Sequence, residues 1–437
     1  MTTDYLIEPG GRLFGRIRVP GDKSISHRAL MLGALGDGVT HIEGLLQGQD
    51  VLATLAAFRA MGVDIVEPQA GHLTISGVGL DGLRRPGHPL DMGNSGTAMR
   101  LMSGILAAQP FDSELVGDSS LHKRPMRRVV EPLNAMGACI KTADGDCPPL
   151  SIKGGQRLQG IDYVMPVASA QVKSALLLAG LYADGVTAVT ELATTRDHTE
   201  RMLKGFGYDV STADHTVRLQ GGGRLTGCDI QVPGDLSSAA FFLVGAAIAP
   251  ASTLQLEGVG VNPTRSGVLT LLQRMGADVE LHHRREIGGE MIADIHVRHS
   301  RLRGITIPED EVSLAIDEFP ILFVAAACAD GDTVLRGAGE LRVKESDRIA
   351  VMAMGLQQLG VTVQEMADGV TIRGGQINGG VVDTQGDHRV AMAFAMAGLR
   401  SQAPLTIGAC ENVDTSFPGF VEMAATAGLG IRTVHAA

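Results

Sequence analysis

The stretch LLQRMGADVEL, residues 271–281, has the pattern that decides the fold. A run of helix-forming residues ends at Met275, Gly276 follows, and residues 277–281 then alternate apolar and charged side chains. Glycine at such a point is typical of a left-handed helix C-cap, and the alternation is typical of a strand with one buried face. The stretch therefore predicts a helix, a sharp turn at Gly276 and a β-strand.

The same pattern recurs six times along the chain. The glycines that follow the helix-like runs are Gly62, Gly137, Gly207, Gly276, Gly360 and Gly428. A second series of apolar helices alternates with the first, and its predicted starts are Ser24, Gly96, Ala170, Leu236, Glu318 and His388. Twelve helices with strands between them predict an α/β protein.

Length and repetition both predict two domains. The chain has 437 residues, more than the ~250–300 at which a single hydrophobic core stops growing. Six copies of one unit give three copies per domain, and we place the boundary near 231–235, after the sixth helix. Duplication for packing alone, as in a solenoid, would also produce repeats, but it does not require polar residues at the helix starts.

Composition excludes several classes of protein. Hydrophobic residues make up 44% of the chain, and the five cysteines form no C-x-x-C pair, so neither a disulfide framework nor a cysteine zinc site is indicated and a reducing cytoplasm fits. We expect no targeting or membrane segment. A net charge of −11 argues against nucleic acid as the main partner, although a local cluster of cations can still bind a small anion.

The first two helix starts of the apolar series have the residues of an anion site. In GDKSISHR, we expect Lys23 just before a helix, Ser24 near its N-cap and Arg28 one turn later on the same face. In GNSGTAMR, Gly93 and Gly96 leave backbone N–H groups accessible at a helix N-terminus. By itself this second motif fits a tight packing turn as well as a ligand loop.

Two further segments place arginines at helix starts. In HKRPMRR, Arg124 precedes Pro125, a good first helical residue, and the arginines at 127 and 128 fit a solvated basic face. In RDHTE, Asp197 and Glu200 fit a capping box, which leaves Arg196 outside the helix, and His198 fits a structural role.

The C-terminal half contains two more clusters. In LRVKESDR, Lys344 and Arg348 are predicted on one helical face with Glu345 beside them, although surface ion pairs would give the same pattern. In GDHR, His388 and Arg389 stand at a helix start, where Asp387 can cap the helix or orient the imidazole. The recurrence of such clusters at equivalent points indicates a cleft for substrates that bear phosphate and carboxylate groups.

Eight motifs in order resemble one family over nearly the whole chain. They are GDKSISHRA, GNSGTAMR, KRPM, ASAQVKSA, RDHTERM, PGDLSSAAFF, LRVKESDR and GDHRVAMA, and together they resemble the 5-enolpyruvylshikimate-3-phosphate synthases, also called 3-phosphoshikimate 1-carboxyvinyltransferases. The resemblance implies two similar domains, each of three βαβαββ repeats arranged as an inside-out α/β barrel, with the active site in the cleft between them. The implied domains are 21–235 and 1–20 plus 236–437, in a monomer.

The resemblance also implies the reaction, a step of the shikimate pathway. The enolpyruvyl group of phosphoenolpyruvate moves to the 5-hydroxyl of shikimate 3-phosphate through a tetrahedral intermediate, and no metal or organic cofactor is needed. The residues implied for shikimate 3-phosphate are Lys23, Ser24, Arg28, Ser169, Gln171, Arg196, Asp317 and Lys344. Those implied for phosphoenolpyruvate are Lys23, Gly96, Arg124, Arg348 and Arg389, and Gln171 also contacts this substrate. The implied proton carriers are Asp317 and Glu345, with Lys23 and His388 assisting.

One departure bears on inhibition. Many members carry a lysine one residue before T-F-P near the C-terminus, whereas this chain reads VDTSFP and has Thr415 there. This feature and RDHTE resemble the second class of the family, whose glyphosate-tolerant members often have a bulkier residue where Gly96 stands. Since Gly96 leaves that space open, we expect glyphosate to compete with phosphoenolpyruvate.

Two other functions stay open from the residues. The UDP-N-acetylglucosamine enolpyruvyl transferases share the fold, but their reactive cysteine has no counterpart in the stretch from Gly117 to Arg128. A non-catalytic protein that binds a phosphorylated metabolite would need the arginines, but not the proton carriers Lys23, Asp317 and Glu345.

Overall fold

The computed structural model describes residues 2–436, except the side chains of residues 2, 68 and 436. Its internal contacts divide the chain into two compact units. Unit 2 consists of Gly21–Val232 with Glu286–Glu290, and unit 1 consists of Met1–Pro20, Pro233–Arg285 and Met291–Ala437. The chain therefore passes from unit 2 to unit 1 after Val232, within the stretch 231–235 that the repeats indicate, and the domain implied by the resemblance extends to Asp235. No sequence signal marks the segment 286–290.

Unit 2 contains three four-stranded sheets, in the orders β14-β3-β5-β4, β6-β7-β9-β8 and β10-β11-β13-β12. Its strands are β3 (Asp37–Glu43), β4 (Asp64–Gln69), β5 (His72–Val78), β6 (Leu90–Asp91), β7 (Ser113–Val116), β8 (Ile140–Lys141), β9 (Leu150–Ile152), β10 (Asp162–Val164), β11 (Val186–Thr190), β12 (Val210–Ala213), β13 (Thr216–Gln220) and β14 (Asp229–Gln231). Its helices are α1 (Lys23–Leu35), α2 (Gln49–Ala60), α3 (Gly96–Leu106), α4 (Arg127–Ala135), α5 (Ala170–Gly180) and α6 (His198–Gly205).

Unit 1 contains sheets in the orders β16-β17-β15-β2, β18-β20-β19 and β21-β22-β1-β23. Its strands are β1 (Thr2–Gly11), β2 (Phe14–Ile17), β15 (Thr253–Gly260), β16 (Asp278–Ile287), β17 (Glu290–Arg298), β18 (Asp332–Leu335), β19 (Thr362–Met366), β20 (Gly369–Arg373), β21 (Gly380–Asp383), β22 (Leu405–Gly408) and β23 (Leu429–Ala436). Its helices are α7 (Leu236–Ile248), α8 (Gly267–Arg274), α9 (Glu309–Val312), α10 (Phe319–Ala327), α11 (Arg348–Gln358), α12 (His388–Ala397) and α13 (Phe420–Ala427).

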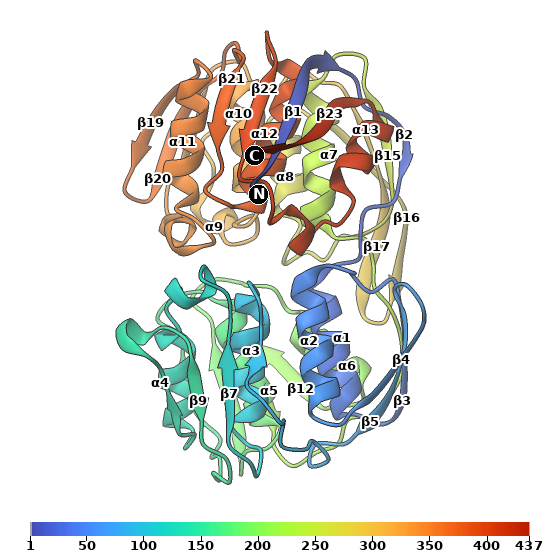
Figure 1. The fold of residues 1–437 in the computed structure, drawn as a ribbon, viewed down its shortest axis with the longest axis vertical. Coiled ribbons are helices and arrows are strands. Elements are labelled where there is room, and N and C mark those ends of the chain that lie inside the picture. The colour runs from blue at the N-terminus through green and yellow to red at the C-terminus, as the bar shows by residue number, and fades with distance from the viewer. Residues whose placement is uncertain (1, 437) are drawn as a thin grey trace. The chain divides into compact units, whose positions relative to one another are not determined.

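The sheets repeat one pairing pattern. In the first sheet of unit 2, β14 runs parallel to β3, and β5 joins both β3 and β4 antiparallel. In the last sheet of unit 1, β21 runs parallel to β22, and β1 pairs antiparallel with β22 and β23, so that Tyr5 lies opposite Ile407 and Thr433. Strand β1, from the start of the sequence, thus completes a sheet built from its last residues (Figure 1).

All twelve predicted helices are present, and the α/β class is confirmed; α9 is a short additional helix. The six repeat glycines all have positive φ, as a left-handed C-cap requires: Gly62 (86°), Gly137 (102°), Gly207 (78°), Gly276 (92°), Gly360 (84°) and Gly428 (114°). Glycine adopts this backbone conformation without steric cost, which explains its recurrence at these helix ends.

The two helix series are buried differently. Every residue of α7, α10 and α12 is buried, and the three helices pack against one another between the sheets of unit 1 (Figure 1). The helices that end at the repeat glycines, such as α8 and α13, keep one polar face toward solvent. A helix that is apolar on every side must be enclosed by the rest of the protein, whereas a helix with one polar face can lie at the surface. The composition of each series therefore decides whether its helices are central or peripheral.

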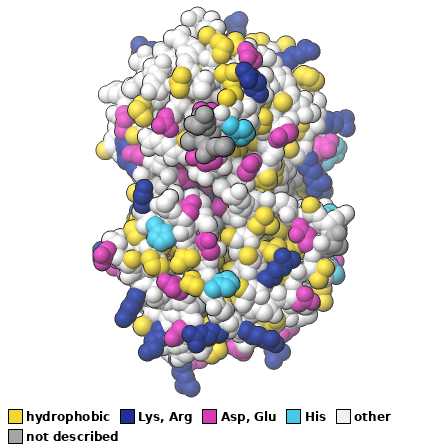
Figure 2. Space-filling view, viewed as in Figure 1, with side chains coloured by type: hydrophobic (Ala, Val, Ile, Leu, Met, Phe, Trp, Pro, Cys, Tyr) yellow, Lys and Arg dark blue, Asp and Glu magenta, His cyan; other side chains and the backbone are white. Residues whose placement is uncertain are grey.

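The face drawn in Figure 2 shows no dominant basic patch of the kind that binds nucleic acid. On the face drawn in Figure 2, acidic and basic side chains alternate, and neither type forms one dominant patch. Within residues 2–436, no helix is both long and apolar enough to cross a membrane.

Two exposed glycines at the end of α6 give a test of the C-cap. Gly207 has a φ of 78°, and a Cβ there would meet no atom closer than 4.0 Å, so Gly207→Ala introduces backbone strain alone. We expect it to reduce the free energy of unfolding by about 1–2 kcal/mol. Gly205→Ala, two residues earlier in helical conformation with equal space, should instead raise it by up to about 1 kcal/mol. Thermal unfolding midpoints that move in the same direction for both variants would contradict this explanation.

Candidate active site

Three helix N-termini are joined in unit 2. The first turns of α1, α3 and α5 contain no acidic residue. Gln171 on α5 donates to Thr97 on α3 over 2.9 Å. Arg28 on α1 donates to Ser174 on α5 over 2.7 Å. Because helix N-termini carry partial positive charge and N–H groups outside the helix ladder, this end of unit 2 favours phosphate and carboxylate ligands.

The cap of the first helix differs from the prediction. Helix α1 begins at Lys23, and its N-cap is Asp22, whose carboxylate accepts from the backbone N–H of Ile25 over 2.9 Å. Lys23, expected just before the helix, is therefore its first residue, whereas Ser24 lies near the N-cap as predicted. Ser169, a predicted binding residue, is the N-cap of α5. The prediction missed Asp22, although an aspartate directly before a helix is a favoured N-cap.

Two guanidinium groups flank Gly96. A Cβ atom at this position would lie 2.8 Å from Nη1 of Arg100 and 3.3 Å from Nη1 of Arg124. Arg100 donates to Oε1 of Gln171 over 3.0 Å, and Arg124 donates to Oδ1 of Asn94 over 2.6 Å. Arginines held in this way present planar donors that suit carboxylate or phosphate. Sequence reasoning missed Arg100 and Asn94, although both stand in GNSGTAMR and Arg100 follows Gly96 by one helical turn.

Arg124 is not beside a helix start. Helix α4 begins at Arg127 and not at Pro125, and Arg124 follows a 3-10 turn in extended conformation with its side chain buried. The prediction of a solvated basic face is confirmed for Arg127 and Arg128, since both are exposed and Arg127 pairs with Glu131 over 2.6 Å.

Lys23 and Arg28 both have partners within unit 2. The Nζ atom of Lys23 lies 3.0 Å from Oδ2 of Asp50 on α2. Arg28 is buried and donates from Nε to Thr199 over 2.7 Å and from Nη1 to the carbonyl of Ser24 over 2.9 Å. Burial lowers the pKa of Arg28 to about 10, so the group stays charged at neutral pH.

Arg196 is half-buried directly before α6. The predicted capping box is wrong: Asp197 makes no side-chain cap hydrogen bond and pairs with Arg201 over 2.8 Å. Glu200, the other member of the predicted box, pairs with Lys173 over 2.7 Å. A neighbour one helical turn later therefore holds the carboxylate of Asp197, and a lysine of another helix holds that of Glu200.

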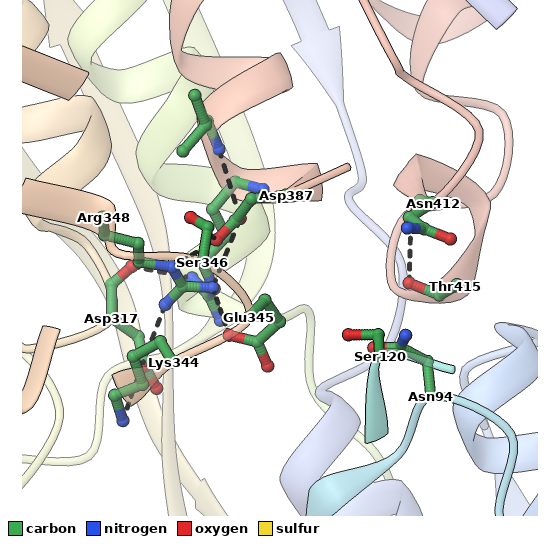
Figure 3. Close-up of polar contacts among 12 residues, drawn as sticks. Asn94, Ser120, Asp317, Lys344, Glu345, Ser346, Arg348, Asp387, Asn412 and Thr415 are labelled. Atoms are coloured by element: carbon green, nitrogen blue, oxygen red, sulfur yellow. Dashed lines mark hydrogen bonds and ion pairs between the residues drawn. The ribbon is translucent and has the colours of Figure 1, made fainter. Parts of the chain in front are cut away.

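In unit 1, one buried arginine gathers three carboxylates (Figure 3). Arg348 donates from Nη2 to Oε2 of Glu345 over 2.6 Å and from Nε to Oδ2 of Asp387 over 2.8 Å. Its Nη1 lies 3.6 Å from Oδ1 of Asp317. Burial alone would lower the pKa of Arg348, but the charges of Asp387 and Glu345 outweigh it and raise the pKa overall. Arg348 therefore remains a cation inside the unit.

Lys344 reaches the same carboxylate from a loop. Its Nζ lies 3.4 Å from Oδ1 of Asp317. The predicted common helical face with Arg348 is wrong, because Lys344 has an extended backbone after the 3-10 turn Gly339–Val343, and α11 begins only at Arg348. The two cations nevertheless converge on Asp317, as Figure 3 shows.

The start of α12 completes this cluster. The capping role predicted for Asp387 is confirmed, since its carboxylate accepts from the backbone N–H of Arg389 over 2.9 Å. Arg389 donates from Nη1 to the carbonyl oxygen of Asp317 over 3.1 Å, and His388 is buried at the first position of the helix. Attraction by Arg348 lowers the pKa of Asp387 although burial raises it. One carboxylate thus ties the helix start to the buried arginine.

Thr415 does not replace a missing lysine. Its hydroxyl donates to the carbonyl of Asn412 over 2.6 Å, within the 3-10 turn Val413–Thr415 and its cap (Figure 3). Within the described part of the chain, no group of three or more His, Cys, Asp or Glu side chains is placed to hold a metal ion.

The structure thus brings the predicted residues of each unit into polar clusters. Asp317, Lys344, Glu345, Arg348 and Arg389 are linked by direct contacts in unit 1. In unit 2, Gly96, Arg124 and Gln171 meet around Arg100. Charged groups arranged in this way can hold anionic substrates and can move a proton between a carboxylate and a bound hydroxyl.

The family model for EPSP synthase (3-phosphoshikimate 1-carboxyvinyltransferase) matches residues 7–423. The chain belongs to the EPSP synthase family. A 3-phosphoshikimate 1-carboxyvinyltransferase of Acidithiobacillus ferrooxidans is 63% identical over 434 residues, which is 99% of this chain and 100% of the relative. One of Alkalilimnicola ehrlichii is 62% identical over 429 residues, 98% of this chain and 96% of the relative. An EPSP synthase structure from Acinetobacter baumannii matches with a TM-score of 0.89 and 55% identity, covering 100% of both chains. The EPSP synthase resemblance and the predicted two-domain α/β fold are therefore confirmed.

The pairing of Asp387 with Arg348 predicts how acid affects this EPSP synthase fold. Asp387→Asn keeps a cap acceptor but loses the charge, and we expect it to reduce the free energy of unfolding by about 2–3 kcal/mol at neutral pH. Because the pKa of Asp387 is lowered in the folded state, its contribution is complete above the unfolded value of about 4 and is lost as the pH falls further. Urea unfolding of both proteins between neutral and acid pH measures this. A difference that does not shrink in acid, or a matching loss in the exposed-pair control Arg127→Gln, would contradict it.

Proposed function

We propose that this chain transfers the enolpyruvyl group of phosphoenolpyruvate to the 5-hydroxyl of shikimate 3-phosphate, releasing phosphate. The observation that carries the proposal is identity of about 60% to 3-phosphoshikimate 1-carboxyvinyltransferases over nearly the whole chain. The clusters support it because both substrates carry a phosphate and a carboxylate, which match the guanidinium groups and helix N-termini.

Each unit contributes a set of binding residues to this proposal. In unit 2, Lys23, Ser24, Arg28, Ser169, Gln171 and Arg196 hold shikimate 3-phosphate, and Lys23, Gly96 and Arg124 hold phosphoenolpyruvate. In unit 1, Asp317 and Lys344 hold the first substrate, and Arg348 and Arg389 hold the second. Support comes from the contacts that fix these side chains, such as those of Arg124 with Asn94 and of Lys344 with Asp317.

The reaction needs proton transfer at two atoms. The 5-hydroxyl loses its proton as its oxygen bonds to C2 of phosphoenolpyruvate, and C3 gains a proton to become a methyl group. C3 then loses a proton, the bond from C2 to the phosphate oxygen breaks, and phosphate leaves. We assign these transfers to Asp317 and Glu345, with Lys23 and His388 assisting. Since Arg348 contacts both carboxylates, a change of charge on one is felt by the other.

The proposal also covers the cellular compartment, the oligomeric state and the domains of the protein. We place the enzyme in the cytoplasm as a monomer of two three-repeat domains, 21–235 and 1–20 plus 236–437. Support for the compartment comes from five cysteines that are unbonded to one another in the described structure, since disulfides are rare in a reducing environment.

Phosphate release tests the reaction. We expect release only when shikimate 3-phosphate and phosphoenolpyruvate are both present, and Glu345→Gln should lower kcat by about 10²–10⁴-fold, because the amide keeps the size of the side chain but cannot accept the proton. The exposed Glu422→Gln on α13 removes the same charge elsewhere in unit 1 and should leave kcat unchanged. Retained binding of both ligands without phosphate release would favour a metabolite-binding protein instead.

The space at Gly96 predicts the response to glyphosate. Glyphosate should compete with phosphoenolpyruvate in the wild-type enzyme. In Gly96→Ala, the new methyl group would press on Arg100 and Arg124, so the KM for phosphoenolpyruvate should rise several-fold, by about 1–2 kcal/mol of lost binding. The Ki for glyphosate should rise further, because glyphosate is one backbone atom longer than phosphoenolpyruvate. Inhibition that is not relieved by phosphoenolpyruvate, or equal effects on both constants, would refute this explanation.

A further inference from the structure

Helix α5 carries a buried lysine that the proposed reaction does not use. The side chain of Lys173 is 1% exposed, and its Nζ lies 2.5 Å from Oε1 of Glu191 and 2.7 Å from Oε1 of Glu200. A lysine is rarely buried unless its charge is paired, because removal from water is costly. Glu191 directly follows β11, and Glu200 lies on α6, so carboxylates from two different segments contact the same ammonium group.

The second oxygen of Glu191 holds the end of that loop. Oε2 accepts from the backbone N–H of Thr195 over 2.8 Å and from its hydroxyl over 2.5 Å. Thr195 directly precedes Arg196. The loop 192–194, between Glu191 and Thr195, is held little by apolar packing, since the side chain of Leu192 is 66% exposed. The contact of Glu191 with Thr195 therefore fixes the backbone from which Arg196 extends.

The same two helix turns also hold Arg28. Ser174, the neighbour of Lys173 on α5, accepts from Nη2 of Arg28, and Thr199, the neighbour of Glu200 on α6, accepts from Nε. Two cations, Arg28 and Lys173, are thus balanced by the two buried carboxylates. The contacts of Lys173 are therefore part of a polar network that ties α1, α5 and α6 together.

Stability alone does not account for this arrangement. Replacing a buried ion pair by apolar side chains of similar volume is often neutral or stabilising, so a set of four charges is an expensive way to fill a core. It does fix geometry, because ion pairs and hydrogen bonds restrict direction and distance more than apolar contacts do. The set includes one residue of the proposed binding machinery, Arg28, and its Glu191 holds the residue that precedes another, Arg196.

We propose that Lys173 is a positioning residue for substrate binding: through Glu191 and Thr195 it fixes the loop that presents Arg196 to shikimate 3-phosphate. This rests on the proposed role of Arg196. Lys173 itself touches no substrate, so its loss should weaken binding of shikimate 3-phosphate and leave the chemical step intact at saturation. A residue that only stabilised the fold would reduce the amount of active enzyme without changing KM.

The test separates KM from kcat in three variants. Lys173→Met removes the charge, and we expect the KM for shikimate 3-phosphate to rise about 10- to 100-fold, as displacement of a positioning group does. Thr195→Val keeps the shape and the N–H but loses the hydroxyl, and should raise that KM about tenfold. Thr195→Ser keeps the hydroxyl and is the matched control, with KM within about twofold of wild type. In all three, kcat and the KM for phosphoenolpyruvate at saturating shikimate 3-phosphate should change little.

A double-mutant cycle with Arg196→Met shows whether the effect passes through Arg196. We expect Arg196→Met to raise the KM for shikimate 3-phosphate, and Lys173→Met to add less than about threefold in that background. Multiplicative effects, or a normal KM in folded Lys173→Met, would overturn the positioning role. If Lys173→Met does not fold, Thr195→Val decides, and a normal KM there overturns the proposal. An unchanged KM in Arg196→Met would instead reject the assignment of Arg196 and, with it, the role of Lys173.

Discussion

A helix that is buried on every side leaves the N–H groups of its first turn out of reach of water. Helices α7, α10 and α12 are enclosed along their whole length, so their starts need acceptors from the protein. Asp387 and Asp235 provide side-chain caps for α12 and α7, and each then brings a negative charge that needs a buried cation. The buried ion pairs at the starts of α7 and α12 follow from this requirement.

The cation comes from a similar place in several repeats. Arg124, Arg196 and Arg265 lie two or three residues before the second helix of their repeats, and Arg348 opens it. Arg348 pairs with Asp387, and Arg265 pairs with Asp235 and donates to Ser237 over 2.7 Å. In unit 2, where the cap of α3 is an uncharged serine, Arg124 meets the amide of Asn94. One repeated construction therefore produces both a structural ion pair and a group suited to a ligand.

Sequence reasoning predicted what depends on local chemistry. Gly276 and its five equivalents decide where helices end whatever their surroundings, because only glycine adopts the left-handed conformation cheaply. Six of the helices were predictable for this reason and the other six from their apolar runs, and the motifs were long enough to indicate the family.

The errors concern the partner that each polar side chain takes, which sequence spacing alone does not decide. Asp197 fits a capping box from its spacing, but Arg201 holds its carboxylate. Lys344 and Arg348 stand four residues apart, as on a helix, yet a cap at Asp347 starts the helix after Lys344. The pairing of Lys173 with Glu191 joins a helix to a loop, and no periodicity in the sequence marks such a contact. The sequence therefore does not predict which side chains pair within the site.

In the last sheet of unit 1, the first strand of the chain pairs with strands that are synthesised last. Strand β1 lies between β22 and β23, and Asp4 accepts from the backbone of Ala409, 405 residues further along the chain. Unit 2 is almost one continuous segment, so a ribosome releases nearly all of it before the partners of β1 exist. During that interval β1 has unpaired edges and apolar residues such as Ile7 that end up buried. The nascent chain therefore carries an unpaired strand β1 while unit 2 is already able to fold.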